Sequence, residues 1–215
     1  MVSGNSAVVA LLASEGFGDV LGALHQPHQG NHKGFAASNG LRCIVDNAAF
    51  SRPDPNRFWN YLIDWWGMAG TFEWAACPDV VGDAVATLAA WKAFRCEMEC
   101  EIGYVPLPLA FVAQDGSERM IDSLPWNEMA GLFVGGTTEW KLGAGARAVV
   151  TEAHQRSLWV HVGRVNSWVR LLYCRDVLKA DSVDGKNWSA FSSADTLRKV
   201  LTRLRRSPEW SLFAA

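Results

Sequence analysis

The sequence predicts an α/β protein, a small (β/α)8 TIM-type barrel that occupies residues 1–215 as one domain. Short β-rich runs alternate regularly with longer helical stretches, which is the rhythm of parallel strands joined by helices. Several of these runs are apolar throughout, as expected for strands buried on both faces. The length of 215 residues and the hydrophobic fraction of 49% suit one sizeable core, at the small end of the range for such a barrel.

The expected elements follow the chain in strand–helix order. Eight strands can be drawn, at residues 7–12, 20–24, 41–46, 71–76, 108–114, 131–135, 158–163 and 180–184. Helices are expected at 55–67, 83–101, 117–129, 142–157 and 167–178. Asp83 follows Gly82 and is expected to cap the second of these helices. Apolar residues at helical spacing predict that residues 194–206 form a C-terminal amphipathic helix with a basic outer face.

Charge, cysteine content and hydrophobic patterning indicate the compartment of the protein and the partners it is expected to have. A formal net charge of −2 provides no overall attraction to nucleic acid, so any such contact requires a local basic patch. The five cysteines are an odd number scattered through apolar segments, which favours reduced thiols. The first residues lack the basic start of a secretory signal, and no window is apolar enough to span a membrane. We therefore expect a cytoplasmic protein with no membrane partner.

Polar side chains end several of the predicted strands. Asp46, Asp79 and Gln114 each follow an apolar run, and Asp181 and Asp184 stand three positions apart before a glycine. Because the carboxyl ends of the strands form the active site of such a barrel, we expect these groups to share one pocket. The chain contains neither a G-x-G-x-x-G after the first strand nor a G-x-x-x-x-G-K-[ST], so no nucleotide cofactor is expected.

Six segments in chain order resemble motifs of the tRNA-guanine transglycosylase superfamily, most closely its short phage and bacterial relatives that exchange guanine in DNA for a 7-deazaguanine. The segments are Asp46-Asn47-Ala48-Ala49-Phe50, Pro78-Asp79-Val80-Val81-Gly82-Asp83, Val112-Ala113-Gln114-Asp115-Gly116, Gly131-Leu132-Phe133-Val134-Gly135-Gly136, His161-Val162-Gly163-Arg164-Val165-Asn166-Ser167 and Asp181-Ser182-Val183-Asp184-Gly185.

The resemblance implies a pentosyltransferase that works through a covalent aspartyl-glycosyl intermediate. By that resemblance Asp184 is the nucleophile and Asp46 the general acid and base. The remaining residues would bind the substrate: Asp79 and Gln114 at the purine edge, Gly135 and Gly136 through their backbone, Asp181 as a supporting carboxylate, His161 facing the pocket and Arg164 near the phosphates. The residue types fit this chemistry, because glycosidic cleavage needs one carboxylate at the anomeric carbon and one proton donor.

The implied partners are DNA carrying a guanine nucleotide and a free 7-deazaguanine base. The Cys-x-Cys-x-x-Cys…His zinc site of the tRNA branch is missing, so we expect a barrel without a zinc subdomain and without a metal. This difference favours DNA over tRNA. An accessory DNA-binding protein or a homodimer is compatible with the small size and low charge, and a phage-encoded enzyme would act in the cytoplasm of its bacterial host.

Two other functions remain open. A metal-assisted hydrolase on the same barrel would use His25, His28 and His32, three histidines within eight residues, together with Asp46 or Asp184. A non-catalytic nucleic-acid-binding barrel would keep the base and phosphate contacts without chemistry. Metal analysis separates the first of these from a metal-free enzyme, and the absence of a covalent glycosyl adduct identifies the second.

Overall fold

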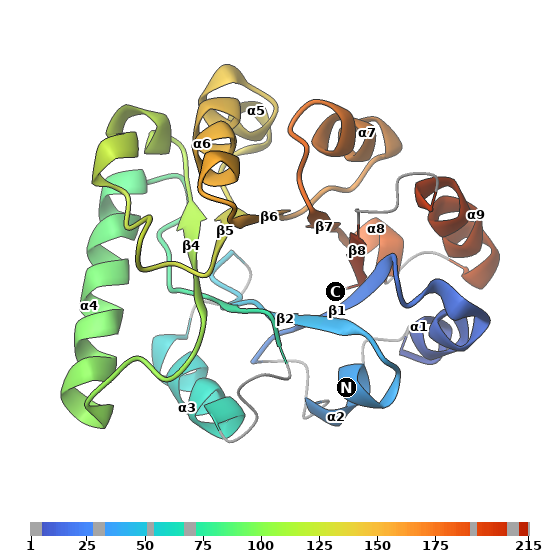
Figure 1. Cartoon of the computed structure of the whole chain (residues 1–215), viewed down its shortest axis with the longest axis horizontal. Coiled ribbons are helices and arrows are strands. Elements are labelled where there is room, and N and C mark those ends of the chain that lie inside the picture. Colours follow the sequence, from blue (N-terminus) through green and yellow to red (C-terminus); the bar gives the residue numbers. More distant parts are fainter. Residues whose placement is uncertain are drawn as a thin grey trace.

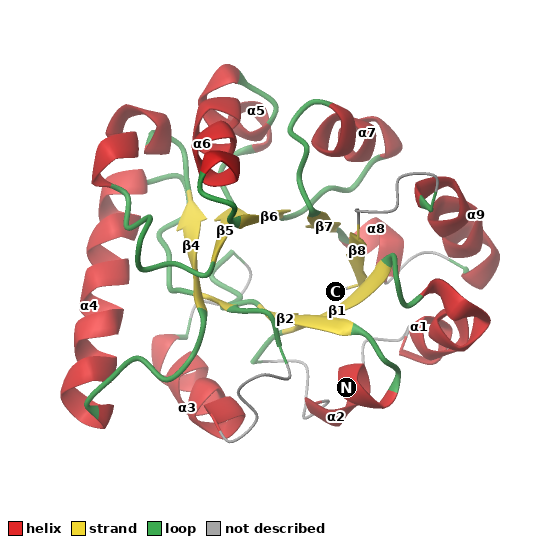
Figure 2. Ribbon diagram, in the orientation of Figure 1, coloured by secondary structure: helices red, strands yellow, loops and turns green. Residues whose placement is uncertain are grey.

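The computed structural model describes residues 6–27, 33–50, 54–66, 72–189, 193–205 and 211–214. Its eight parallel strands close into a barrel in the order β1-β2-β3-β4-β5-β6-β7-β8, with β8 hydrogen-bonded to β1. Figure 1 shows helices arranged around this barrel, and Figure 2 separates the two layers by colour. The predicted (β/α)8 architecture is therefore confirmed.

The strands are short and nearly all of their described residues are buried. They are β1 (Leu21–His25), β2 (Arg42–Val45), β3 (Ala75–Ala76), β4 (Leu109–Ala113), β5 (Gly131–Val134), β6 (Trp159–Val162), β7 (Ser182–Asp184) and β8 (Ser211–Ala214). Neighbouring strands pair in parallel register, for example His161 with Ser182 between β6 and β7. The parallel register brings the carboxyl ends of all strands to one rim.

The helices form the outer layer. They are α1 (Ser6–Leu12), α2 (Lys33–Ser38), α3 (Pro55–Trp66), α4 (Ala84–Ile102), α5 (Thr138–Lys141), α6 (Ala144–Gln155), α7 (Trp168–Asp176), α8 (Lys186–Ser189) and α9 (Ala194–Leu204), with a π-helical turn at Ala13–Phe17 and a 3₁₀ turn at Ser117–Ser123. The side chain of Asp83 accepts a hydrogen bond from the Ala86 amide and caps α4, as predicted. Within the described residues, no helix combines the length and apolar character that a membrane crossing requires.

Two apolar clusters hold these layers together. The smaller one fills the barrel interior with Leu24, Ile44, Trp74, Ala76, Ala110, Val112 and Phe133. The larger one lies between the strands and the helices, where the outward faces of the strands meet buried positions such as Leu197, Leu201 and Leu204 of α9. Both faces of the sheet are thus covered, which explains the continuously apolar strands.

Two element predictions were wrong. Residues 7–12 lie in a helix, because Ala and Leu are strong helix formers and Val9 and Leu12 share a buried face. The eighth strand is instead β8, at residues 211–214. The helix expected at 117–129 is only a 3₁₀ turn before Pro125. The helix expected at 142–157 is confirmed as α6, and the short helix α5 before it was not expected.

Candidate active site

Three carboxylates and one cation converge at the carboxyl-end rim of the barrel. Asp46 follows β2, Asp79 lies just beyond β3, and Asp184 ends β7. The negative charges of Asp184 and Asp79 both contribute to raising the pKa of Asp46, so the three groups interact across the rim. The guanidinium of Arg164, in the loop after β6, feels the charge of all three. These strand ends therefore lie close enough to interact, whereas a shared substrate pocket stays a prediction.

Asp46 has the most perturbed acid–base equilibrium among these carboxylates. Burial, and secondarily the charge of Asp184, raises its pKa from 3.8 to about 6. Gln26 donates a hydrogen bond to Oδ2 at 2.5 Å, and the Ala48 amide donates to Oδ1 at 3.3 Å, which partly offset the cost of burial. A carboxyl group of this kind can hold or release a proton near neutral pH.

Asp79 and Gln114, predicted to read a purine edge, are hydrogen-bonded to each other. The Asp79 carboxylate accepts from Gln114 Nε2 and from Asn47 Nδ2, each at 2.7 Å. Gln114 Oε1 accepts from the Gly82 amide at 2.9 Å. Burial raises the pKa of Asp79, and these two amide donors act against that rise. The network forms a rigid wall of the site, and Asn47 is a member that sequence reasoning missed.

Asp184 is held by a chain of hydrogen bonds along the inside of the barrel. The Trp159 indole N–H donates to Ser182 Oγ at 2.8 Å, and Ser182 Oγ lies 2.8 Å from His161 Nδ1. A hydroxyl can both donate and accept, whereas a carboxylate can only accept, so the contact with Asp184 places a proton on Nε2. Nε2 then donates to Asp184 Oδ1 at 3.1 Å.

The second oxygen of Asp184 is available to a substrate. Oδ1 accepts from His161 and also from the Arg164 amide at 3.2 Å. Within the described part of the chain, no hydrogen bond uses Oδ2, and the side chain keeps 12% exposure. His161 is completely buried, with its ring centroid 4.9 Å from that of Phe133. His161 was predicted to face the pocket and bind the substrate, and the structure makes it a buried partner of Asp184.

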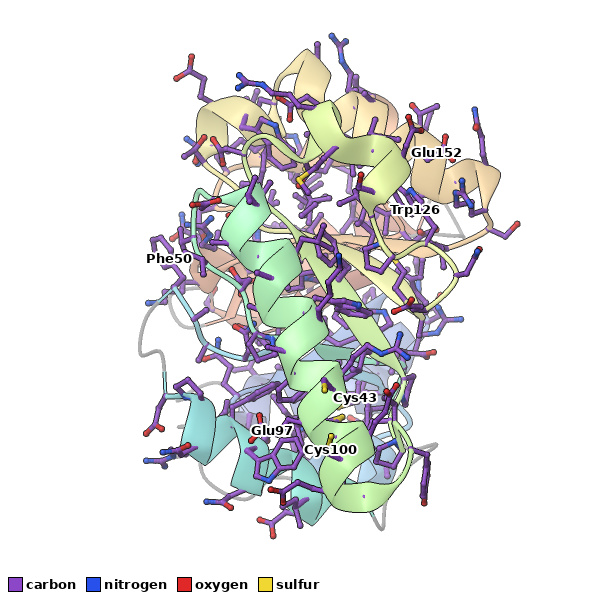
Figure 3. The ribbon with its side chains drawn as sticks, turned by 90° about the vertical axis from the view of Figure 1, so that its left-hand side faces the viewer. Cys43, Phe50, Glu97, Cys100, Trp126 and Glu152 are labelled. Carbon is purple, nitrogen blue, oxygen red and sulfur yellow. The ribbon has the colours of Figure 1, made fainter. Side chains whose placement is uncertain are left out.

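Arg164 joins the loops that surround the rim. Its Nη2 donates to the carbonyls of Gly136 at 2.5 Å and Gly135 at 2.8 Å, and its guanidinium lies 3.9 Å from the ring centroid of Phe50. Figure 3 shows Phe50 at the molecular surface. A Cβ at position 135 would lie 2.5 Å from Gln114 Nε2, so the loop approaches the network only because glycine stands there. The two glycines thus meet Arg164 through their carbonyls.

Lys141 is a further buried group that sequence reasoning missed. Its Nζ donates to the Gly163 carbonyl at 2.5 Å, behind the loop that carries Arg164. Burial lowers its pKa to about 8, while the charge of Asp184 acts in the opposite direction. No pattern in the sequence distinguishes this lysine from those on the surface, because it lies in the short helix α5 that was not anticipated.

Asp181 lies away from this cluster. It precedes β7, so it stands at the amino end of the strand that Asp184 ends. Its Oδ2 accepts a hydrogen bond from the Val160 amide at 2.7 Å, at the start of β6. The structure therefore brings together Asp46, Asp79, Gln114, Asp184, His161, Arg164, Gly135 and Gly136, but not Asp181.

The described residues contain no group of three or more His, Cys, Asp or Glu side chains arranged to hold a metal ion. His25 ends β1 and is buried, but His28 and His32 of the proposed metal loop lie outside the described residues. His161 is already engaged by Ser182 and Asp184.

Comparisons with known proteins identify no family for this chain. No family model matches, and no curated protein matches. Among solved structures, the chain is similar to a COG1816 amidohydrolase from Burkholderia ambifaria, crystallised with bound zinc. The identity is 11% and the TM-score 0.38, and the match covers 96% of this chain and 57% of that protein. The chain thus spans little more than half of that amidohydrolase, and a similarity this low carries neither substrate nor metal across.

The predicted membership of the tRNA-guanine transglycosylase superfamily was wrong. The comparisons return no transglycosylase family and no curated transglycosylase, and the similar structure is a hydrolase-type enzyme. The six short motifs are individually common at the strand ends of any parallel barrel, since such ends favour glycine and polar residues. Neither pentosyl transfer nor exchange of 7-deazaguanine is therefore assigned to this chain.

Proposed function

We propose that the rim is the active site of a hydrolase that cleaves a small polar substrate whose leaving group must be protonated. The observation that carries this proposal is the unequal pair of carboxylates: Asp46 with a pKa of about 6, and Asp184 fixed by His161 with one oxygen open. Two carboxyl groups in different environments are the pattern expected of a separate acid and base.

In the proposed reaction, Asp184 Oδ2 takes a proton from a water molecule as the water oxygen bonds to the electrophilic carbon. The bond from that carbon to the leaving oxygen or nitrogen then breaks, and the Asp46 carboxyl gives its proton to the leaving atom. His161 keeps Asp184 in one orientation through Nε2–H. Proton transfer from Asp184 back to Asp46 through solvent restores both groups for the next cycle.

Arg164 and the Asp79 network define where the substrate lies. The Arg164 guanidinium is fixed by two carbonyls and by the Phe50 ring, so it presents a rigid cation to the rim. The hydrogen bonds that Asp79 accepts from Gln114 and Asn47 hold these side chains together on one side of the site. The site therefore suits a compact, polar molecule with an electron-rich group facing Arg164.

The test is a hydrolysis screen with three substrate classes: nitrophenyl glycosides, nucleosides and small amides. We expect turnover in one class, a loss of at least about a hundredfold in kcat for Asp184→Asn and for Asp46→Asn, and a decline in kcat/KM above pH 6 as Asp46 loses its proton. Glu152→Gln is the matched control, because this acid pairs with Arg156 on the outer helix α6. Figure 3 shows Glu152 on that helix.

Two results would contradict the proposal. Turnover that survives both substitutions would remove the carboxylates from the chemistry. Turnover that is abolished by a chelator and restored by Zn²⁺ would assign water activation to a metal instead of Asp184. Metal analysis of the purified protein accompanies the screen for this reason.

A further inference from the structure

A polar pocket opens at the amino end of the barrel, opposite the rim. Its volume is about 310 Å³, and it is lined by Arg42, His154, Ser157, Leu158, Trp159 and Asp181. These residues belong to the starts of β2, β6 and β7 and to the end of α6 and the loop after it. Figure 1 shows β2 on one side of the barrel and β6 and β7 on the other, so the strands that contribute to this amino-end pocket come from both sides.

A cation with unused donors stands on one side of the amino-end pocket. The guanidinium of Arg42 lies 4.6 Å from the centroid of the Trp159 ring, which holds its plane in position. Its Nε forms an ion pair with Glu73 Oε1 at 3.8 Å, a separation too long for a hydrogen bond. Among the described residues no hydrogen bond uses an Arg42 N–H, so the planar fork is free to bind a carboxylate in bidentate fashion.

A partly buried carboxylate stands in the same pocket. Asp181 Oδ2 accepts from the Val160 amide, whereas no hydrogen bond within the described part of the chain uses Oδ1. Burial raises the pKa of Asp181, and the charges of His154 and Arg42 act against that rise, so all three side chains interact through space. Arg42 and Asp181 nevertheless form no ion pair within 4 Å among the described contacts, which leaves a gap between opposite charges.

Such a gap favours a ligand that carries both charges. A phosphate or a simple carboxylic acid would satisfy Arg42 but bring a negative charge to Asp181, and an amine would do the reverse. A zwitterion places each charge beside its opposite. The volume is at the lower limit for small-molecule sites, which suits a molecule of about ten heavy atoms.

We propose that the amino-end pocket binds a free α-amino acid, with the carboxylate on Arg42 and the ammonium group on Asp181. This site is separate from the rim, and the proposal does not rest on the proposed hydrolase activity. Leu158 and the Trp159 ring provide the apolar surface for the amino-acid side chain.

The test is calorimetric titration of the full chain with the twenty L-amino acids, followed by the amine and the deaminated acid that correspond to any that bind. We expect one or a few amino acids to bind, and each analogue that lacks one charge to bind at least tenfold more weakly, as expected for a lost charge-assisted hydrogen bond. Arg42→Gln and Asp181→Asn should each cause a similar loss.

Asp195→Asn is the matched control, because it makes the same acid-to-amide change on the surface of α9, where Asp195 pairs with Arg198, and should leave the affinity unchanged. Thermal unfolding of each variant establishes that it is folded. Failure of all twenty amino acids to bind the wild type would overturn the proposal. Binding that survives both Arg42→Gln and Asp181→Asn, or that is lost in Asp195→Asn, would also overturn it.

Discussion

Replacing Asp46 with asparagine is expected to stabilise the protein at neutral pH while removing its proposed activity. Burial raises the pKa of this carboxyl from 3.8 to about 6, so the native state binds more protons than the unfolded state between these values. The stabilisation of the native state is complete below pH 3.8 and is lost as the pH rises through 6. At about 1.36 kcal/mol per pH unit, the loss amounts to at most about 3 kcal/mol by pH 7.

Asparagine carries no charge at any of these pH values, so the variant should lack this loss. Gln26 can turn its amide to keep a hydrogen bond with the new side chain, because both of its polar atoms lie at that end. Urea unfolding at pH 4, 5, 6 and 7 measures the difference in free energy of unfolding between the two proteins. This difference should increase as the pH rises, by up to about 3 kcal/mol in favour of Asp46→Asn between pH 4 and 7. Parallel curves for the two proteins would refute the reasoning.

Three further predictions concern the scaffold. Asp83→Ala removes the cap of α4 and should lower the free energy of unfolding by about 1 kcal/mol in urea titrations; an unchanged midpoint would show that the cap is unimportant. Gly163→Ala places a Cβ 2.6 Å from the Phe133 ring and should cost about 1–3 kcal/mol, seen as a lower melting temperature, whereas an unchanged one would mean that the ring moves aside freely. Lys141→Met removes a group whose pKa burial lowers from 10.5 to about 8, so wild type should gain stability relative to the variant between pH 8 and 10.5; a constant difference would contradict the buried charge.

Several parts of the fold could be predicted because the barrel imposes a strong local signal. Continuously apolar runs located β2, β4, β5 and β6. The polar residues that end the strands then followed, because parallel strands must present their carboxyl ends together. That logic placed Asp46 and Asp184 at one rim without any knowledge of their partners.

The failures have equally local causes. The segment at residues 7–12 is apolar enough for a strand, and periodicity over so short a run does not distinguish it from a helix. Asp181 and Asp184 were read as neighbours because they are three positions apart, but a strand rises about 3.3 Å per residue, so three steps separate their positions by about 10 Å. The contacts of Asn47 and Lys141 depend on loops whose paths no periodic pattern encodes.

The transglycosylase interpretation failed for a related reason. Short motifs that occur in barrel order indicate the fold and not the function. Any parallel barrel has polar residues at its strand ends and glycines in the loops that follow. The specific roles depend on which hydrogen bonds remain open. Both oxygens of Asp79 accept hydrogen bonds, from Gln114 and Asn47, whereas no hydrogen bond among the described residues uses Oδ2 of Asp184. The sequence does not distinguish these two conditions.

The pairing of β6 with β7 connects the two ends of the barrel. Register places His161 opposite Ser182, and the Trp159 indole reaches the same hydroxyl from the first position of β6. Trp159 also walls the amino-end pocket, so that pocket and Asp184 stand at opposite ends of one hydrogen-bonded chain. The Trp159 indole donates to Ser182 Oγ, and this hydroxyl lies at hydrogen-bond distance from the His161 ring that contacts Asp184. Asp184 Oδ1 has a second donor in the Arg164 amide, so a change along this chain would weaken one of two hydrogen bonds that support Asp184 as an anion.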